Sequence, residues 1–283
     1  MSTQALPCSG ATRPSASKRK SSVTVFSKLP TNWIARSARK TIVLMASPAD
    51  KGVRLNRFLA SCGIASRRKS EAFILEGRVE INGDIITDLG VRVREDDHVK
   101  FDGRLLRKKS DLTLVLNKPV GYICTRDDPE GRNTIYDLLP NKFGSLHYVG
   151  RLDFNSSGLL LVTSSGELTE LLTHPRYHVE KEYEVVLDRM FHVEDTQQLL
   201  DGIHFQEGLA KAESVKFDSR KRLKMVLTQG FNRQIRRMFS KLDYKVKRLE
   251  RIRIGQFTAP DLSTGDFRLL SRREIEAATT SKL

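Results

Sequence analysis

Residues 149–163 read VGRLDFNSSGLLLVT, a polar, glycine-flanked loop that runs directly into an apolar stretch typical of a buried strand. The loop carries one carboxylate, Asp153, two residues after Arg151. Catalytic groups tend to lie on loops that a rigid scaffold positions. Spacing alone, however, favours a plainer interpretation, in which Arg151 and Asp153 form a surface ion pair in a turn. The segment marks a candidate site without deciding its chemistry.

Apolar strands and short helices alternate around this segment, between residues 112 and 275. Helical spacing predicts helices at Glu167–Thr173 and Arg233–Leu242. The pattern is mixed α+β, and no internal repeat is visible in it. Alternating or continuous apolar runs predict strands at Leu112–Leu116, Leu159–Thr163, Glu182–Leu187 and Leu223–Leu227.

A compact basic unit precedes this region, from residue 53 to residue 108. Apolar residues at helical spacing in Leu55–Leu59 predict a first helix, which Gly63 ends. Ser66 is a candidate N-cap for a second helix through Leu75. The turn pair Asn82-Gly83 then predicts a hairpin with positive φ at both central residues.

A third strand is expected at His98–Phe101, and the charged stretch Arg104–Asp111 is interpreted as a linker. The unit is therefore predicted to be a small helix-helix-hairpin module. Its second helix opens with Arg67, Arg68 and Lys69, although the positive end of a helix dipole disfavours cations. Free N–H groups and three cations form an anion site suited to a phosphate backbone. A solvated charge run is the alternative.

The charge of the chain indicates a polyanionic partner. The sequence holds 49 Lys and Arg against 34 Asp and Glu, a net charge of +15. Residues 1–49 contribute eight basic and no acidic side chains, so the remainder keeps +7. No apolar run approaches the ~20 residues of a membrane-spanning helix. Nucleic acid is therefore a better partner than a membrane.

The first 49 residues allow three interpretations: a transit peptide, a disordered RNA-binding arm, or a mis-assigned start with translation beginning at Met45. A cytoplasmic location is expected, or an organelle if the segment is a transit peptide. The chain ends Ser281-Lys282-Leu283, the spelling of a peroxisomal address, which we interpret as chance. Residues 276–283 are expected to be a tail.

Motifs for cofactors and metals are missing from the sequence. It contains no GxxxxGK[ST] phosphate loop, no Rossmann glycine pattern and no HExxH. The cysteines Cys8, Cys62 and Cys124 are too scattered for a metal pair. His174 and His178 are four apart, but Pro175 between them makes a shared helix face doubtful. The sequence therefore offers no recognisable motif for binding a cofactor or a metal.

The front unit resembles the alpha-L RNA-binding module of small-subunit ribosomal proteins. The resemblance rests on Arg54–Leu59, Ala65–Arg68 and Gly77–Gly83. It implies that the module binds RNA, and by itself it says nothing about chemistry.

The larger region resembles the RsuA/RluB/RluE/RluF family of pseudouridine synthases. The similarity runs in order from about Val53 to Ile275, so several motifs lie in register. It implies a catalytic domain at residues 112–275 with a mixed, mainly antiparallel sheet, acting on uridines of ribosomal RNA without a cofactor. The motifs that carry it are Gly150–Asp153, Ser157–Thr163, Gly166–Leu168, Leu172–Pro175, Glu180–Tyr183 and Gly230–Met238.

The resemblance also implies roles for four residues. Asp153 would be the essential carboxylate, either a nucleophile at the ribose C1′ or a base toward C2′. Arg236 would pair with it, because a carboxyl in a closing site needs a nearby cation to stay ionised. Tyr183 would stack on the uracil, with an ordinary strand aromatic as the alternative, and Arg151 would help hold the flipped-out nucleotide.

RNA contacts are expected from further basic and polar residues, although a solvated basic face is the alternative for the arginines of the late motif. Phe154–Ser156 and Lys241–Tyr244 depart from the family pattern without removing a proposed catalytic group. The expected RNA-binding residues are Arg54, Arg57, Arg67, Arg68, Lys69, Arg78, Asn82, Arg233 and Arg237.

The interpretation is a monomeric enzyme that converts uridine to pseudouridine in ribosomal RNA, with the large subunit favoured. A non-catalytic RNA-binding or ribosome-assembly factor with the same fold is the alternative. Another RNA enzyme, such as a methyltransferase or synthetase, is disfavoured by the missing motifs. The target uridine is not encoded in any short motif, because such targets are selected by RNA shape over a broad surface.

Overall fold

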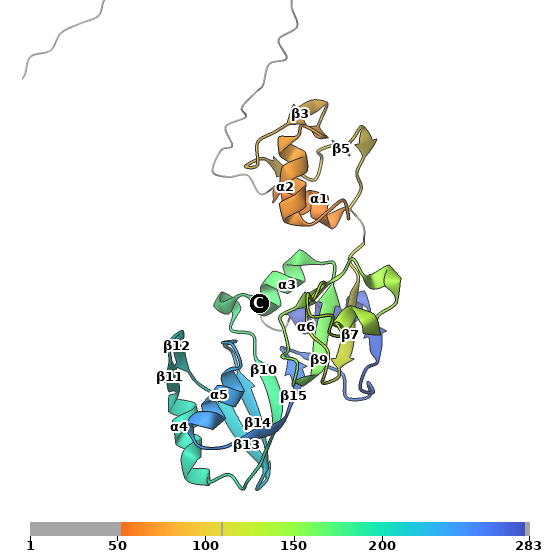
Figure 1. The fold of residues 1–283 in the computed structure, drawn as a ribbon. Helices are drawn as coiled ribbons and strands as arrows, with labels where there is room; N and C mark the ends of the chain where they lie inside the picture. The colour runs from red at the N-terminus through yellow and green to blue at the C-terminus, as the bar shows by residue number, and fades with distance from the viewer. Residues whose placement is uncertain (1–51, 109, 281–283) are drawn as a thin grey trace, which may run out of the picture. The chain divides into compact units, whose positions relative to one another are not determined.

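The computed structural model describes residues 52–108 and 110–280 (Figure 1). The expectations for residues 1–49 and for Ser281–Leu283 lie outside the described residues. The two parts of the fold are the front module, residues 52–108, and the large domain, residues 110–280.

The front module consists of two helices and short strands. Strand order in its four-stranded sheet is β3-β2-β5-β6, while β1 pairs with β4. Its core is a small apolar cluster centred on Leu55, Leu59 and Ile74, which are fully buried. The elements are β1 (Val53–Arg54), α1 (Leu55–Ser61), α2 (Arg67–Leu75), β2 (Val79–Ile81), β3 (Asp84–Ile86), β4 (Arg92–Val93), β5 (Val99–Phe101) and β6 (Arg104–Leu105).

The local signals of the module act as predicted. The Ser66 side chain accepts a hydrogen bond from the Lys69 amide and caps α2. Asn82 and Gly83 have φ values of 54° and 96°, so the β2–β3 turn has the predicted positive φ at both positions. The linker prediction is wrong at its start, because Arg104–Leu105 forms β6 and pairs with β5. Asp102 and Gly103, at φ 48° and 74°, form the turn that returns the chain.

The large domain is built on one nine-stranded sheet, with helices of eight residues or more at α3, α5 and α6. Its strands are β7 (Thr113–Lys118), β8 (His147–Val149), β9 (Ser157–Thr163), β10 (Lys181–Leu187), β13 (Ser214–Ser219), β14 (Arg222–Leu227), β15 (Val246–Ile254), β16 (Phe257–Thr258) and β17 (Phe267–Leu269). A separate two-stranded hairpin is formed by β11 (Ile203–Phe205) and β12 (Gly208–Ala210). The helices are α3 (Gly166–Thr173), α4 (Thr196–Asp201), α5 (Gln234–Lys241) and α6 (Arg272–Thr280), with 3-10 turns η1 (Ile135–Leu138), η2 (Asn141–Phe143), η3 (Pro175–Tyr177) and η4 (Val193–Asp195).

The sheet is antiparallel at every junction of these strands except one. The main strand order is β13-β14-β10-β15-β9-β7-β17, with β16 paired to β15 and β8 paired to β9. Strands β15 and β9 are parallel and meet only at their Glu250↔Ser157 and Arg251↔Gly158 pairs. The single parallel junction therefore lies where the loop after β8 enters β9. The predicted mixed, mainly antiparallel α+β fold is confirmed.

Strands β7 and β9 are buried on both faces, which explains their continuous apolar sequences. Leu160 and Val162 face one apolar cluster, while Leu159 and Leu161 face another. A third cluster packs α4 and α5 onto β10, β14 and β15. All four strands and both helices predicted from periodicity are present, although Arg233 precedes α5 in a left-handed conformation rather than lying within it.

The C-terminal end of the fold extends past the boundary expected at residue 275. Helix α6 continues to Thr280, and both Ile275 and Ala278 pack against the cluster of β9 and α3. Within residues 52–108 and 110–280, every helix is too short or too polar to span a lipid bilayer.

Candidate active site

The loop between β8 and β9, residues 150–156, carries Asp153 and is called the Asp153 loop below. It leaves β8 at Gly150, whose φ is 68°, and buries Leu152 while Asp153 stays half-buried. A turn closes it, because the Ser156 amide donates to the Asp153 carbonyl at 3.0 Å. The carboxylate is thus presented from a turn that leads into the buried strand β9.

Lys118, the last residue of β7, supports this loop through hydrogen bonds to its backbone. Its side chain is fully buried, and Nζ donates to the carbonyl oxygens of Ser156 at 2.8 Å, Pro119 at 2.9 Å and Asp153 at 3.2 Å. Burial lowers the pKa of Lys118 to about 8. Sequence reasoning missed this residue. The available signal was that Lys118 shares an inward-facing register with Leu114 and Leu116.

A second cation lies beneath the same loop. Arg251 on β15 is 3% exposed, and its Nε donates to the Leu159 carbonyl at 2.9 Å. Nη1 reaches the Arg151 carbonyl at 3.5 Å, and the buried Nη2 has no hydrogen-bond partner. Gly158 allows this approach, because a Cβ there would lie 2.3 Å from the Arg251 carbonyl oxygen. Arg251 was not predicted from the sequence either.

Cys124 packs against the loop from a third direction. Its Sγ lies 3.4 Å from the Leu152 amide nitrogen and 3.5 Å from the Leu152 carbonyl oxygen. Burial raises the pKa of this thiol, so it stays a neutral packing group at neutral pH. The loop is therefore held through its backbone, which leaves its exposed side chains available.

Arg236 contacts the loop from α5. Nη2 donates to the Asn155 carbonyl at 2.6 Å and Nη1 to the Val246 carbonyl at 2.8 Å, while the buried Nε has no partner. Burial lowers the pKa of Arg236, and the neighbouring Asp153 charge acts in the opposite direction. Between these two described residues there is no ion pair within 4.0 Å, because the guanidinium is engaged by loop and strand carbonyls. Direct pairing with Asp153 remains a proposal.

Tyr183 and Arg151, the other two predicted catalytic residues, lie close to the same junction. Tyr183 on β10 is half-buried, packs against two of the apolar clusters of the domain and is the cross-strand neighbour of Arg251. Arg151 is exposed, and its carbonyl contacts Arg251. The sheet thus gathers the four predicted residues around one loop.

Five of the expected RNA-binding residues of the module differ in how far their side chains are exposed. Four cations are exposed: Arg54, Arg67, Arg68 and Lys69. Arg57 is half-buried.

Arg78 and Asn82 make contacts within the module. The Arg78 guanidinium binds both Asp102 carboxylate oxygens, at 2.9 and 2.6 Å, and lies over the rings of Phe73 and Phe101. The Asn82 side chain donates to Asp97 and accepts from the His98 amide. These contacts stabilise the module, and an RNA contact by either residue remains a proposal.

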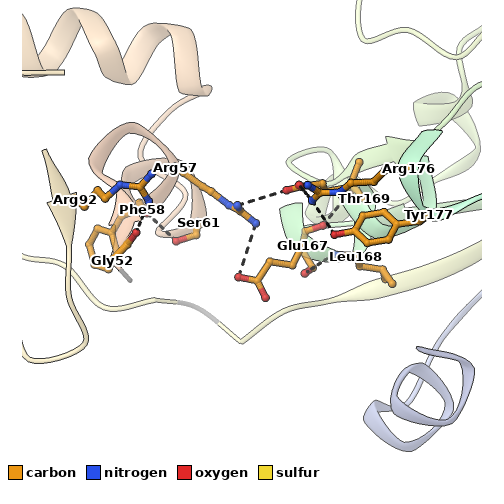
Figure 2. Close-up of polar contacts among 12 residues, drawn as sticks. Gly52, Arg57, Phe58, Ser61, Arg92, Glu167, Leu168, Thr169, Arg176 and Tyr177 are labelled. Atoms are coloured by element: carbon orange, nitrogen blue, oxygen red, sulfur yellow. Dashed lines mark hydrogen bonds and ion pairs between the residues drawn. The ribbon is translucent and has the colours of Figure 1, made fainter. Parts of the chain in front are cut away.

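The two histidines considered as a metal pair in the sequence lie in the segment after α3. His174 and His178 are both exposed, and the His174 ring accepts from the Arg176 amide at 3.2 Å. Figure 2 shows Arg176 beside Tyr177, to whose hydroxyl it donates at 2.7 Å. Arg176 also donates to the Glu170 carboxylate on α3 at 2.5 Å. These contacts hold the turn η3 together and tie it to α3.

Comparisons with known proteins agree with this arrangement. Residues 112–241 match the family described as RNA pseudouridylate synthase, and residues 53–99 match the S4 domain. A protein of Bacillus subtilis named ribosomal large subunit pseudouridine synthase B is 35% identical over 229 residues, which cover 79% of this chain and 94% of that protein. The chain belongs to the RNA pseudouridylate synthase family.

Other members of the family are similar to the same extent. A protein of Pseudomonas aeruginosa with the same name is 39% identical over 239 residues, covering 80% of this chain but only 61% of its own length. A solved structure titled crystal structure of pseudouridylate synthase is 30% identical, with a TM-score of 0.59 over 80% of this chain and 100% of that one. The family and the RNA-binding front module implied by the sequence motifs are confirmed. The enzyme interpretation is supported over the non-catalytic alternative.

Proposed function

We propose that this member of the family isomerises one uridine of ribosomal RNA to pseudouridine, with Asp153 as its essential carboxylate. The observation that carries the proposal is the support of the Asp153 loop by Lys118, Arg251 and Arg236, which donate hydrogen bonds to six backbone carbonyls in and beside the loop. A loop held this firmly fixes the carboxylate relative to a bound nucleoside, and such positioning is a large part of catalysis.

The reaction detaches uracil from its ribose, turns it and rejoins it through carbon. Asp153 acts as a nucleophile at C1′ or as a base toward C2′, and both roles require the ionised carboxylate. Positive charges near a carboxylate favour its ionised form. Lys118, Arg251 and Arg236 supply three such charges around the loop, and Arg236 is proposed to pair with the carboxylate.

The remaining roles concern the flipped-out nucleoside. Tyr183, half-buried beside the loop, offers a ring on which the uracil stacks. Arg151, exposed in the loop, holds the extruded nucleotide by a charged contact. Extrusion costs a few kcal/mol, which binding to flanking phosphates offsets.

The front module supplies part of that binding. The exposed Arg67, Arg68 and Lys69 at the N-terminal end of α2 combine three cations with the positive end of the helix. We propose that the module contacts the RNA backbone while the large domain carries out the reaction. The protein is proposed to act as a monomer in the cytoplasm, without a cofactor, on large-subunit ribosomal RNA.

Replacement of Asp153 tests the proposal. Asp153→Asn and Asp153→Ala are expected to abolish pseudouridine formation in purified ribosomal RNA while leaving the Kd for that RNA within about twofold. Asp127→Asn, which alters an exposed acid elsewhere in the domain, is the matched control and keeps activity. Activity that persists in the Asp153 variants contradicts the assignment, and RNA binding without any activity in the wild type supports the ribosome-assembly alternative.

The subunit and the position require a separate measurement. Pseudouridines in ribosomal RNA are mapped in cells with and without the gene, and one large-subunit site is expected to lose its modification. Loss at a small-subunit site instead contradicts the proposed substrate and leaves the reaction intact.

A further inference from the structure

A hollow of about 560 Å³ lies between the β11–β12 hairpin and helix α5, and it is called the α5 hollow below. Its volume falls within the roughly 300–1,000 Å³ range of ligand sites in proteins. The residues that line it are His204, Phe205, Gln206, Arg237, Ser240 and Lys241. Among residues 110–280, none of these side chains forms a hydrogen bond with the Asp153 loop. The hollow is therefore separate from the site described above.

The helix wall of the hollow is basic. Arg237 and Lys241 lie one turn apart on α5, and Arg233 directly precedes the helix in a left-handed conformation. The opposite face of α5 is apolar and buried through Ile235, Met238 and Phe239, so the basic row is directed outward. One row of cations along a helix matches the spacing of a negatively charged backbone better than that of a neutral small molecule.

The hairpin wall contributes an aromatic platform. The Arg237 guanidinium lies 3.9 Å from the centroid of the Phe205 ring, and two hydrogen bonds to Glu207, at 2.7 and 3.0 Å, hold it there. Arg237 lowers the pKa of Glu207 to about 2, so this acid stays ionised and the arrangement persists at neutral pH. A guanidinium held over a ring leaves its other side for stacking, and planar bases stack on such surfaces.

Helix α5 connects this hollow to the Asp153 loop. Arg236 donates to the Asn155 carbonyl of the loop, while the next residue, Arg237, lines the hollow. Consecutive residues of a helix point about 100° apart, so the two arginines serve neighbouring sides of one helix. An RNA strand that delivers a uridine to the Asp153 loop therefore has the α5 hollow within its path.

We propose that the α5 hollow is a second RNA subsite, which takes one unpaired nucleotide flanking the target uridine. Its base stacks on the Phe205–Arg237 platform, and its phosphate lies against Lys241. The inference rests on the proposed function and adds a specificity element to it, since an extruded neighbour is required in addition to the target.

Two RNA substrates and three variants test the proposal. The long substrate keeps the full loop around the target uridine, and the short one ends next to the target. Arg237→Gln and Phe205→Leu are expected to raise KM on the long substrate about 10-fold, the order expected for one stacked base, with kcat within twofold. Lys241→Gln is expected to reduce the slope of log Kd against log salt by about one phosphate contact. On the short substrate all three behave as wild type.

Abasic nucleotides placed singly along the loop of the long substrate identify the bound position. Wild type is expected to lose affinity at one flanking position, and Arg237→Gln is expected to show no further loss there, because the contact is already gone. Lys142→Gln, an exposed lysine outside the hollow, is the matched control. Phe205→Leu keeps an apolar side chain in place, so a folded variant is available.

The outcomes separate this inference from the proposed function. A wild type that forms no pseudouridine on either substrate sinks the proposed function. The subsite proposal is overturned if the wild type is active and the variants either keep its KM on the long substrate or show an equal rise in KM on both substrates. Unchanged kinetics on naked RNA together with lost activity on assembling ribosomes assigns the hollow to a protein instead, and this also overturns it.

Discussion

The ammonium group of Lys118 is buried beneath the Asp153 loop and donates to the backbone carbonyl of Asp153, 3.2 Å away. Its partners are carbonyls, and no ion pair with a carboxylate within 4.0 Å is present for it among residues 52–108 and 110–280. Burying a charge without an acid partner costs folding free energy. The buried charge of Lys118 therefore lowers the folding stability of the protein at the place where the reactive carboxylate must be held.

Lys118 should make the stability of the protein depend on pH above neutrality. Burial lowers its pKa from 10.5 to about 8, so between these values the unfolded chain binds more protons than the folded one. The free energy of unfolding therefore rises with pH across this window, and the cost is fully present below pH 8. The total rise is about 3 kcal/mol. Urea unfolding of wild type and Lys118→Met at pH 7.5 to 10.5 measures it.

The comparison cancels the titration of other groups, which are common to both proteins. The difference in unfolding free energy, wild type minus Lys118→Met, is expected to grow with pH. A difference that stays constant or shrinks shows that Lys118 is charged in the folded protein throughout.

Gly158 is expected to tolerate no side chain. A Cβ at this position would lie 2.3 Å from the Arg251 carbonyl oxygen and 2.7 Å from its amide nitrogen. Gly158→Ala must then separate β9 from β15 at their parallel junction, at a cost of about 4 kcal/mol or more. Gly265→Ala is the control, because its φ of 91° carries similar strain with nothing within 4 Å of the added Cβ, and about 1–2 kcal/mol is expected. Thermal and urea unfolding compare the two, and equal costs contradict the close approach.

Arg236 should affect turnover far more than RNA affinity. Its Nη2 fixes the Asn155 carbonyl in the Asp153 loop, so Arg236→Gln loosens the carboxylate relative to the substrate. A misplacement near 1 Å costs about 100-fold in rate. We expect kcat to fall by this order, with Kd for the RNA within about threefold. Arg248→Gln, an exposed arginine paired with Glu250, is the control. A variant that loses affinity while keeping kcat assigns Arg236 to phosphate binding.

Periodicity and turn chemistry predicted most of the fold, because those signals are local. Ser66 caps α2 and Asn82-Gly83 turns the hairpin as the sequence indicates, and the buried strand β9 follows from its apolar run. The Asp153 loop was also found, since its motif is contiguous. Family resemblance supplied the chemistry assigned to it.

The support of the loop was not predicted, because most of it depends on distant pairing. Arg251 reaches the Leu159 carbonyl across 92 residues, through the one parallel junction in the sheet. In the sequence, Arg251 is one more cation in a strand with several, and Lys118 resembles the charged end of a strand. The same limit applies to Arg78, whose contacts with Asp102 and Phe101 depend on how β5 returns to β2.

The cations at the start of α2 should set the salt dependence of RNA binding. Each phosphate contact releases condensed counterions, so log Kd changes with log salt by about 0.7–0.9 per contact. Arg67, Arg68 and Lys69 are exposed, so their replacement by glutamine should reduce the slope without unfolding the module, and the triple variant should lose about two to three contacts. Lys108→Gln, exposed beyond the module's sheet, is the matched control. The catalytic rate at saturating RNA should stay unchanged, because these side chains bind substrate outside the Asp153 loop. A slope identical to that of wild type assigns the three cations to a solvated face. Arg237 and Lys241 on α5 would then be the main phosphate contacts.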